Sequence, residues 1–468
     1  MSWLKGGEEF LKKTKIICTI GPACSSRRVL QKMIRKGMSG ARINTAYGTL
    51  DRYRGLIDLV RDVADIPVIL DIKGPEIRVV AKRKLAFKKG DELEVGLKGE
   101  DVSFNWNIQG DVAVDDMILV DNGKLRFRVA QKKKSALVLA ALNAGEIEDG
   151  KGVNVPNKTL TVPTLSEKDR SILEVAKEKN VEFIALSFTR DAQDVLNLRQ
   201  EARGCNFAVI AKIENHEGVD NFNGILDVAD GIMVARGDLG VEIEPEKVPL
   251  VQKSIIKKCN QRGKIVVTAT EMLESMMHSA MPTRAEVSDV ANAILDGTEV
   301  AMLSGETAVG SYPVEAVAMM SRIAAEAERA IENHVEDEGL VNVSDAVSRA
   351  IQRICQEMPI TKVVTLTRSG YTARMISRFK LSQPIIAVTP DPQVKRQLEL
   401  TFGTYPVSIQ YGAAKDRILE VAKKLQATGA IKDRDTVLFT AAFRTRRKHA
   451  SNLIEIHKIE ELREFEND

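Results

Sequence analysis

The chain has 468 residues, more than one ordinary hydrophobic core accommodates, so about two to four domains are expected. Hydrophobic residues make up 44% and charged residues 28% of the sequence, a balance typical of soluble globular proteins, and no apolar run is long enough to span a membrane. The net charge of +3 gives no support for a nucleic-acid partner, and five scattered cysteines without a CxxC pair indicate reduced thiols in a cytoplasmic protein.

The first part of the chain alternates short apolar runs with amphipathic segments. The apolar runs Lys15–Thr19, Gly40–Asn44 and Pro67–Asp71 are predicted strands, separated by helices over Ser25–Lys36 and Leu50–Val63. Alternation of strands and helices is typical of a parallel sheet.

The pattern changes from about residue 74 to residue 157. This segment carries short β-type runs and turn signals such as Lys89–Asp91 and Asp121–Gly123, and it shows no long amphipathic helix. We therefore predict an inserted all-β domain over residues 74–157.

Strand–helix alternation then resumes. The next predicted strands are Val181–Ser187, Phe207–Lys212, Gly231–Ala235, Lys264–Thr268 and Glu299–Leu303. Eight parallel strands with intervening helices predict a (β/α)₈ TIM barrel built from residues 1–73 and 158–337. In that fold, catalytic residues lie at the C-terminal ends of the strands.

Polar and ionisable residues gather at those predicted strand ends. They are Asn44, Asp71, Ser187, Lys212, Glu214, Arg236–Asp238, Thr270 and Ser304–Glu306. This coincidence is the strongest argument from the residues for an active site at the barrel mouth.

The most informative stretch is Ala211–Gly240. Lys212 and Glu214 project to the same side of one strand, and Asp238 follows the next strand along the chain. Two carboxylates with a neighbouring lysine suit a magnesium ion and a phosphoryl group in transfer, and Gly237 lets backbone N–H groups approach an anion. The alternative is a solvated Lys212–Glu214 ion pair with Asp238 capping a turn.

Residues 338–468 are expected to form an open α/β domain. Its predicted strands are Lys362–Leu366, Ile385–Thr389, Tyr405–Ser408 and Thr436–Phe439, with helices over Ala346–Cys355, Thr372–Phe379 and Lys415–Leu425. The loop Thr367–Thr372 places hydroxyls and a glycine before a helix, which can hold phosphate, although a helix cap by Ser369 or Thr372 explains it equally. The basic run Arg444–His449 is either a solvated loop or an anion site.

Several long blocks of this sequence resemble the pyruvate kinase family, in the order in which that family has them. They are Thr14–Cys24 (TKIICTIGPAC), Leu70–Arg78 (LDIKGPEIR), Lys151–Asn157 (KGVNVPN), Ala211–Ile243, Val248–Met276 and Pro282–Val317. The resemblance covers most of the chain. It implies transfer of the phosphoryl group of phosphoenolpyruvate to ADP, giving pyruvate and ATP, the last step of glycolysis.

The resemblance also implies roles for individual residues. Glu214 and Asp238 would bind Mg²⁺ or Mn²⁺, Lys212 would stabilise the phosphoryl group and the enolate, and Thr270 would protonate the enolate through a water molecule. Catalysis would rest on Lys212, Thr270 and Arg42, with substrate contacts from Arg42, Ser187, Lys212, Gly237, Asp238 and Thr270, and nucleotide contacts from Asn44, Tyr47 and Arg78. The resemblance further implies a homotetramer.

The sequence departs from the family pattern after the second strand. Where the family commonly has NFSHG, this chain has NTAYG, so Ala46 lacks a hydroxyl that helps to bind potassium and Tyr47 replaces a histidine near the nucleotide. Asn44, Asp71 and the backbone of Ile72 remain as possible K⁺ ligands, and potassium dependence is left open.

A second departure lies near the C-terminus. The sequence AAFRTRRKHASN replaces a glycine-rich loop that helps to bind fructose 1,6-bisphosphate in many members. The implied effector residues are Thr367, Ser369, Gly370, Thr372 and Arg446. Our hypothesis is that another small phosphorylated effector, or none, binds this domain.

The inserted domain is expected to close over the barrel mouth, with hinges at Lys73–Pro75 and near Val155–Asn157. Two other functions are compatible with the residues. A magnesium-dependent barrel lyase or aldolase would keep Glu214 and Asp238 but need no nucleotide, and an inactive metabolite sensor would use Thr367–Thr372. Formation of pyruvate that depends on ADP distinguishes all three.

Overall fold

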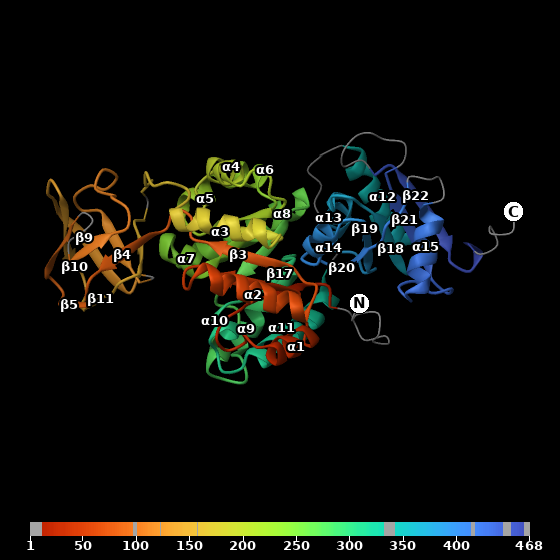
Figure 1. Cartoon of the computed structure of the whole chain (residues 1–468), viewed down its shortest axis with the longest axis horizontal. Helices are drawn as coiled ribbons and strands as arrows, with labels where there is room; N and C mark the ends of the chain where they lie inside the picture. The colour runs from red at the N-terminus through yellow and green to blue at the C-terminus, as the bar shows by residue number, and fades with distance from the viewer. Residues whose placement is uncertain are drawn as a thin grey trace.

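The computed structural model describes residues 12–96, 101–121, 123–156, 158–331, 342–412, 417–442 and 451–462. These residues form a closed eight-stranded barrel, a closed seven-stranded barrel, a two-stranded sheet and a five-stranded sheet. Figure 1 shows the three main units in a row, with the eight-stranded barrel in the middle.

The central barrel is built from eight parallel strands, closed by pairing of the first strand with the last. They are β1 (Lys15–Thr19), β2 (Gly40–Asn44), β3 (Val68–Ile72), β13 (Phe183–Leu186), β14 (Ala208–Ile213), β15 (Gly231–Ala235), β16 (Ile265–Ala269) and β17 (Val300–Leu303). Each predicted barrel strand is confirmed, with bounds within about two residues of the sequence-based ones.

These strands are apolar on both faces because both faces are buried. Inside the barrel, Ile17, Ile69, Phe183, Ile210 and Met233 fill the core. Outside it, the main covering helices are α1 (Arg27–Arg35), α2 (Leu50–Val63), α3 (Glu167–Glu178), α4 (Ala192–Glu201), α6 (Phe222–Val228), α8 (Val248–Arg262), α9 (Arg284–Leu295) and α11 (Pro313–Ala327). None of the helices in the described residues is long and apolar enough to cross a membrane.

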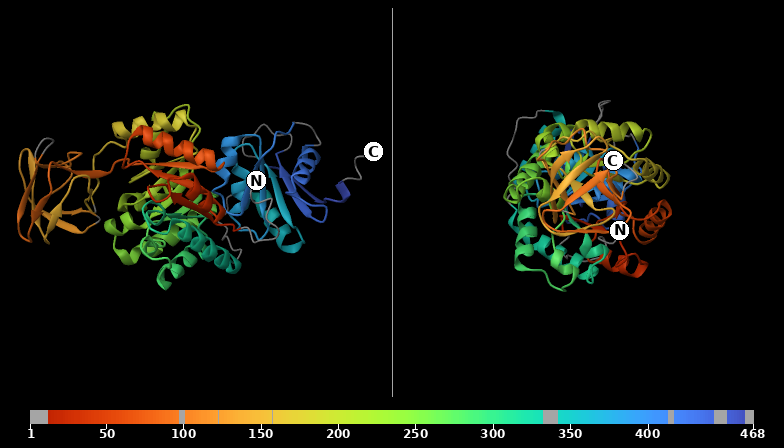
Figure 2. Two further views of the ribbon diagram at one scale, coloured as in Figure 1. Left: turned by 60° about the horizontal axis from the view of Figure 1, so that its bottom comes forward. Right: turned by 90° about the vertical axis from the view of Figure 1, so that its left-hand side faces the viewer.

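The inserted unit is a small barrel of short strands that follows β3 in the chain. Its strands are β4 (Ile77–Ala81), β6 (Glu92–Gly96), β7 (Val102–Phe104), β8 (Met117–Val120), β9 (Leu125–Lys132), β10 (Ala136–Ala141) and β12 (Gly152–Asn154), and a small sheet pairs β5 (Leu85–Phe87) with β11 (Gly145–Ile147). Gly74 lies in the connection with φ of +57°, and a Cβ there would meet Ser187 O at 2.5 Å, so only glycine fits. Figure 2 shows this unit at the end of the molecule remote from the C-terminal sheet.

The C-terminal unit is an open sheet in the order β20-β19-β18-β21-β22, parallel except for the last strand. Its elements are α12 (Val343–Glu357), β18 (Lys362–Leu366), α13 (Tyr371–Ser377), β19 (Ile385–Thr389), α14 (Pro392–Leu398), β20 (Thr404–Ser408), α15 (Arg417–Ala427), β21 (Thr436–Ala441) and β22 (Leu453–Lys458). The short helix α14 was not predicted from the sequence. It starts at a proline, and the Asp391 side chain caps its first turn.

This C-terminal unit packs against the floor of the central barrel, where the strands begin. Lys15 Nζ, at the start of β1, donates to Thr404 O at 2.6 Å. Glu182, just before β13, accepts from Arg396 Nε at 2.6 Å. The barrel mouth therefore faces the inserted unit, and the floor faces the C-terminal sheet.

Candidate active site

A buried hydrogen-bonded cluster occupies the mouth of the central barrel. Lys212 Nζ donates to Ser187 Oγ at 2.7 Å and lies 2.8 Å from Glu214 Oε1 and 3.3 Å from Asp71 Oδ1. The residues come from the C-terminal ends of β3, β13 and β14, which are neighbours in the barrel. The alternative of a solvated Lys212–Glu214 pair is therefore wrong, since Lys212 is 6% exposed and Glu214 is fully buried.

Arg42, at the end of β2, extends this cluster by one strand. Its Nε donates to Asp71 Oδ2 at 2.7 Å and one of its terminal nitrogens donates to Thr19 Oγ1 at 2.9 Å. Burial alone would raise the pKa of Asp71, but the charges of Arg42, Lys212 and Lys73 lower it well below its usual value. Asp71 is thus a permanent anion between two cations.

The surroundings favour the charged form of Lys212 but disfavour the charged form of Glu214. Burial lowers the pKa of Lys212, but the carboxylates of Asp71 and Glu214 outweigh burial and raise it. Burial raises the pKa of Glu214 to about 7, with further contributions from Asp238 and Asp71, against the opposing charge of Lys212. Asp238 is therefore close enough to act on both groups, and it belongs electrostatically to the cluster.

Asp238 and Gly237 lie in the first turn of α7 (Arg236–Glu242), directly after β15. No side chain caps this helix, so the alternative role of Asp238 as a turn cap is not what the structure has. Gly237 N donates to Thr270 Oγ1 at 2.9 Å, which brings the end of β16 to the end of β15.

Thr270 is held in an unusual backbone conformation. Thr270 and Glu271 have φ of +65° and +52°, in the left-handed region that costs about 1–3 kcal/mol for a residue with a side chain. The Arg236 guanidinium donates to Thr270 O and Glu271 O, both at 2.8 Å, and pairs with Asp289 at 2.6 Å. A role for Arg236 could not be predicted, because nothing in the sequence shows that its buried side chain turns toward this loop.

The donor set at the mouth suits a hard divalent cation. Glu214 Oε2 accepts from Phe188 N at 2.7 Å, whereas the buried Oε1 receives no hydrogen bond of normal geometry. Within the described residues, no group of three or more histidine, cysteine or acidic side chains is arranged to hold a metal. Two carboxylates with open positions for substrate oxygens and water are, however, the usual set for Mg²⁺.

The predicted potassium ligands already have partners within the chain. Asn44 Oδ1 accepts from Ala46 N at 3.0 Å, and Ile72 O accepts from Ser187 N at 3.2 Å. Both Asp71 carboxylate oxygens are also engaged.

The predicted nucleotide contacts lie farther out. Tyr47 is 72% exposed, and Arg78, at the start of the inserted unit, pairs with Glu76 at 2.7 Å. The structure therefore does not join these two residues to the Lys212 cluster by any contact among the described residues.

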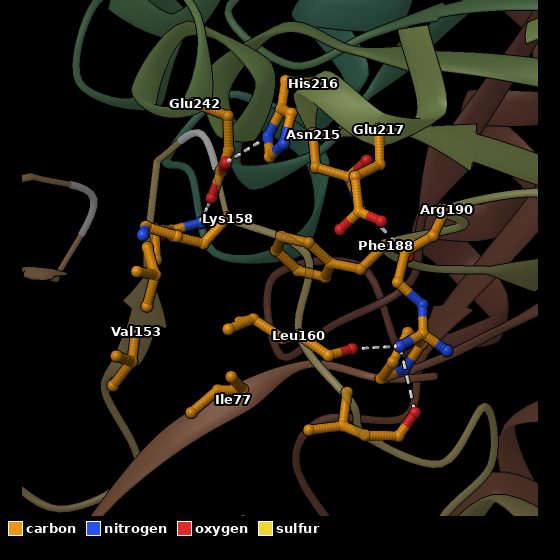
Figure 3. A pocket seen from close by; sticks show the side chains of 14 residues that line it. Ile77, Val153, Lys158, Leu160, Phe188, Arg190, Asn215, His216, Glu217 and Glu242 are labelled. Carbon is orange, nitrogen blue, oxygen red and sulfur yellow. Dashed lines mark hydrogen bonds and ion pairs between the residues drawn. The ribbon is translucent and has the colours of Figure 1, made fainter. Parts of the chain in front are cut away.

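A pocket of about 430 Å³ lies between the inserted unit and the barrel, and Phe188 is one of the residues that line it (Figure 3). Asn154 Nδ2 donates to Glu242 Oε1 at 2.7 Å across it. His216 Nδ1 lies 3.7 Å from Glu242 Oε2, and the carboxylate of Glu242 raises the pKa of His216. The Asn154–Glu242 bond is one of the contacts that fix the inserted unit where it stands.

The predicted effector loop is ordered by its own contacts. Thr367 Oγ1 accepts from Gly370 N at 3.0 Å, and the Thr372 hydroxyl bonds to Ser451 Oγ at 2.7 Å. Gly370, with φ of +77°, is the N-cap of α13 and no side chain caps it, so the proposed cap by Ser369 or Thr372 is wrong. The fifth predicted residue, Arg446, lies outside the described residues.

Comparison with known proteins identifies the family of this chain. The family model "Pyruvate kinase, barrel domain" matches residues 11–317, and "Pyruvate kinase, alpha/beta domain" matches residues 345–457. A pyruvate kinase of Bacillus licheniformis is 42% identical, over 92% of this chain and 78% of that protein, and one of Clostridium perfringens is 40% identical, over 96% and 100%.

A solved structure of a pyruvate kinase from Cryptosporidium parvum superimposes with a TM-score of 0.88 at 35% identity, covering 96% of both chains. Fold, sequence blocks and family models agree over nearly the whole length. The chain belongs to the pyruvate kinase family, the phosphotransferases that form pyruvate and ATP from phosphoenolpyruvate and ADP.

Proposed function

We propose that the Lys212 cluster is the site at which this chain transfers the phosphoryl group of phosphoenolpyruvate to ADP. The observation that supports this site most strongly is the single ammonium group of Lys212, held within 3.3 Å of three oxygens from three neighbouring strands. A rigid, buried cation placed where negative charge develops is what phosphoryl transfer requires of a protein.

Glu214 and Asp238 would hold the divalent ion, Mg²⁺ or Mn²⁺. When bound, such an ion neutralises charge on the phosphate and carboxylate oxygens of the substrate. Gly237, at the N-terminus of α7, and the Thr270 hydroxyl would hold the substrate carboxylate, together with the backbone of Asp238.

The phosphoryl group leaves the enol oxygen of phosphoenolpyruvate and bonds to a terminal phosphate oxygen of ADP. Arg42 and Lys212 balance its charge during transfer, and Lys212 also stabilises the enolate oxygen that is left behind. Ser187 orients the Lys212 ammonium through its 2.7 Å hydrogen bond. The enolate then takes a proton at carbon, which Thr270 relays through a water molecule.

Asn44, Tyr47 and Arg78 are our candidates for contacts to the nucleotide. Because Arg78 belongs to the inserted unit, closure of that unit about Lys73–Pro75 and Val155–Asn157 would bring it to the mouth. The proposed domains are the barrel over residues 1–73 and 158–337, the inserted domain over 74–157 and the C-terminal domain over 338–468.

We expect the assembled enzyme to be a homotetramer in the cytoplasm.

The test of the proposed function is a coupled assay on purified protein. Pyruvate should form only when ADP and Mg²⁺ or Mn²⁺ are both present, and pyruvate formation without ADP would contradict the proposal. Rates in sodium, potassium and tetramethylammonium buffers show whether the activity depends on potassium, for which Asn44, Asp71 and the backbone of Ile72 are the candidate ligands.

A further inference from the structure

A second polar cavity lies at the opposite end of the barrel from the Lys212 cluster. It has an empty volume of about 700 Å³, part of it open to solvent, where the barrel floor meets helices α13 and α14 of the C-terminal unit. The polar residues that line it are Arg199, Asn206, Asp230, Ser369, Arg374 and Gln397. The residues that line it include neither those of the Lys212 cluster nor Thr367 and Thr372.

Positive charge exceeds negative charge around this cavity. Arg199 donates to Asp230 Oδ2 at 2.7 Å, and that same oxygen accepts from Val209 N at 2.8 Å. Lys264, close by, donates to Ala229 O at 2.6 Å, and the charges of Arg374 and Arg199 act on it. Among the described residues that line the cavity, two arginines therefore face the single carboxylate of Asp230.

Arg374 is the cation with the least compensation. Within the part of the chain that the structure describes, its guanidinium forms no ion pair and donates one hydrogen bond, to Ser369 O at 3.4 Å. Glu299, the other carboxylate whose charge reaches it, is fully buried against Lys380 at 3.5 Å. A guanidinium that lines a cavity without a carboxylate partner can accept an anion at little cost in rearrangement.

The uncharged side chains shape the cavity around these cations. Gln397 Nε2 is committed to Glu182 O and Asn206 O, at 3.3 and 3.2 Å, and so fixes the wall between α14 and the barrel. The side chain of Asn206 is exposed at the rim, where its amide can donate to a ligand.

We propose that this floor cavity binds a small ligand through a tetrahedral phosphate dianion, held by Arg374 from the C-terminal unit and Arg199 from the barrel. The guanidinium fork matches phosphate geometry, and the surplus positive charge means that no metal is needed. Since the two arginines come from different units, a bound ligand joins the barrel floor to the C-terminal sheet and stabilises their contact.

Two measurements test the proposal, both in the presence of EDTA so that metal-dependent binding at the barrel mouth is suppressed. In crystals of the full chain soaked with tungstate, a strongly scattering tetrahedral dianion, density is expected between Arg199 and Arg374. In calorimetric titrations with inorganic phosphate and with glycerol 3-phosphate, Arg374→Gln and Asn206→Asp should each weaken binding roughly tenfold or more. Asn206→Asp acts from the exposed rim, so its effect does not depend on disturbing the fold.

The matched control is Arg353→Gln, which removes an exposed arginine of α12 outside the cavity and should leave the affinity unchanged. Tighter binding of the ester indicates a phosphorylated metabolite, and tighter binding of inorganic phosphate indicates free phosphate, and each outcome supports the site. Tungstate found only at the mouth or nowhere, or equal affinities in all variants, overturns it.

Discussion

The mouth and the floor of the barrel hold similar cations in opposite electrostatic settings. At the mouth, Lys212 and Arg42 lie directly against the carboxylates of Asp71 and Glu214, and Asp238 is close enough to act on Lys212, so each of these cations has a carboxylate partner. At the floor, the carboxylate of Asp230 acts on Arg199, Lys264 and Arg374, and Arg374 is also reached by the charge of Glu299, which is buried against Lys380.

This difference indicates what each end can bind. We expect a trianionic substrate to need a divalent ion at the mouth, where the cations are already paired with carboxylates, whereas a phosphate dianion can bind alone in the floor cavity, where Arg374 has no ion pair among the described residues. Anion binding at the mouth should therefore depend on metal, and anion binding at the floor should not.

Removing the central cation should damage the mouth most. Lys212→Ala is expected to lower kcat by at least about 10²–10³, because the charge that balances the phosphoryl group and the enolate is lost. Mg²⁺ affinity should change little. Steady-state rates with saturating metal check this, with Lys32→Ala, an exposed lysine of α1, as control. Near-normal turnover in Lys212→Ala would remove this residue from the mechanism.

Neutralising the acid at the mouth should raise the metal requirement. In Glu214→Gln and Asp238→Asn, the Mg²⁺ concentration for half-maximal rate is expected to rise about tenfold or more, because each variant replaces a proposed carboxylate ligand with a weaker amide. A metal titration of the rate measures it. Phosphate binding at the floor, measured in EDTA, should be unaffected by either variant, and an unchanged Mg²⁺ requirement would count against both assignments.

Arg236 should matter through the position of Thr270. Arg236→Met is expected to lower kcat about tenfold, with little change in KM for phosphoenolpyruvate, because it frees the left-handed turn at Thr270 and Glu271. Arg322→Met, on α11, is the control. A lower Tm with unchanged kcat would make Arg236 purely structural.

A smaller effect is expected at the edge of the barrel mouth, where the chain returns from the inserted unit. Burial would raise the pKa of Asp194, but Arg190 and Thr164 outweigh it and lower the pKa. A lowered folded-state pKa stabilises the fold at pH values above the unfolded-state pKa of about 3.9. This stabilisation is lost as the pH falls below that value. Asp194→Asn should therefore lower Tm at neutral pH, and the difference from wild type should shrink below about pH 4. A pH-independent difference contradicts this account.

The sequence revealed the barrel well because buried parallel strands are apolar on both faces and end in polar residues. Asp71, Ser187, Lys212 and Glu214 could be placed together because strand order determines which C-terminal ends are neighbours. Arg236 and the floor cavity could not be found this way, since both depend on where long side chains turn and on how a separate unit packs.

The most direct test of the account is a crystal structure with Mn²⁺ and phosphoenolpyruvate, without ADP. The anomalous signal of manganese should lie between Glu214 and Asp238, with the phosphate within hydrogen-bonding distance of Lys212 Nζ. Manganese bound elsewhere, or a phosphate remote from Lys212, would contradict the central claim.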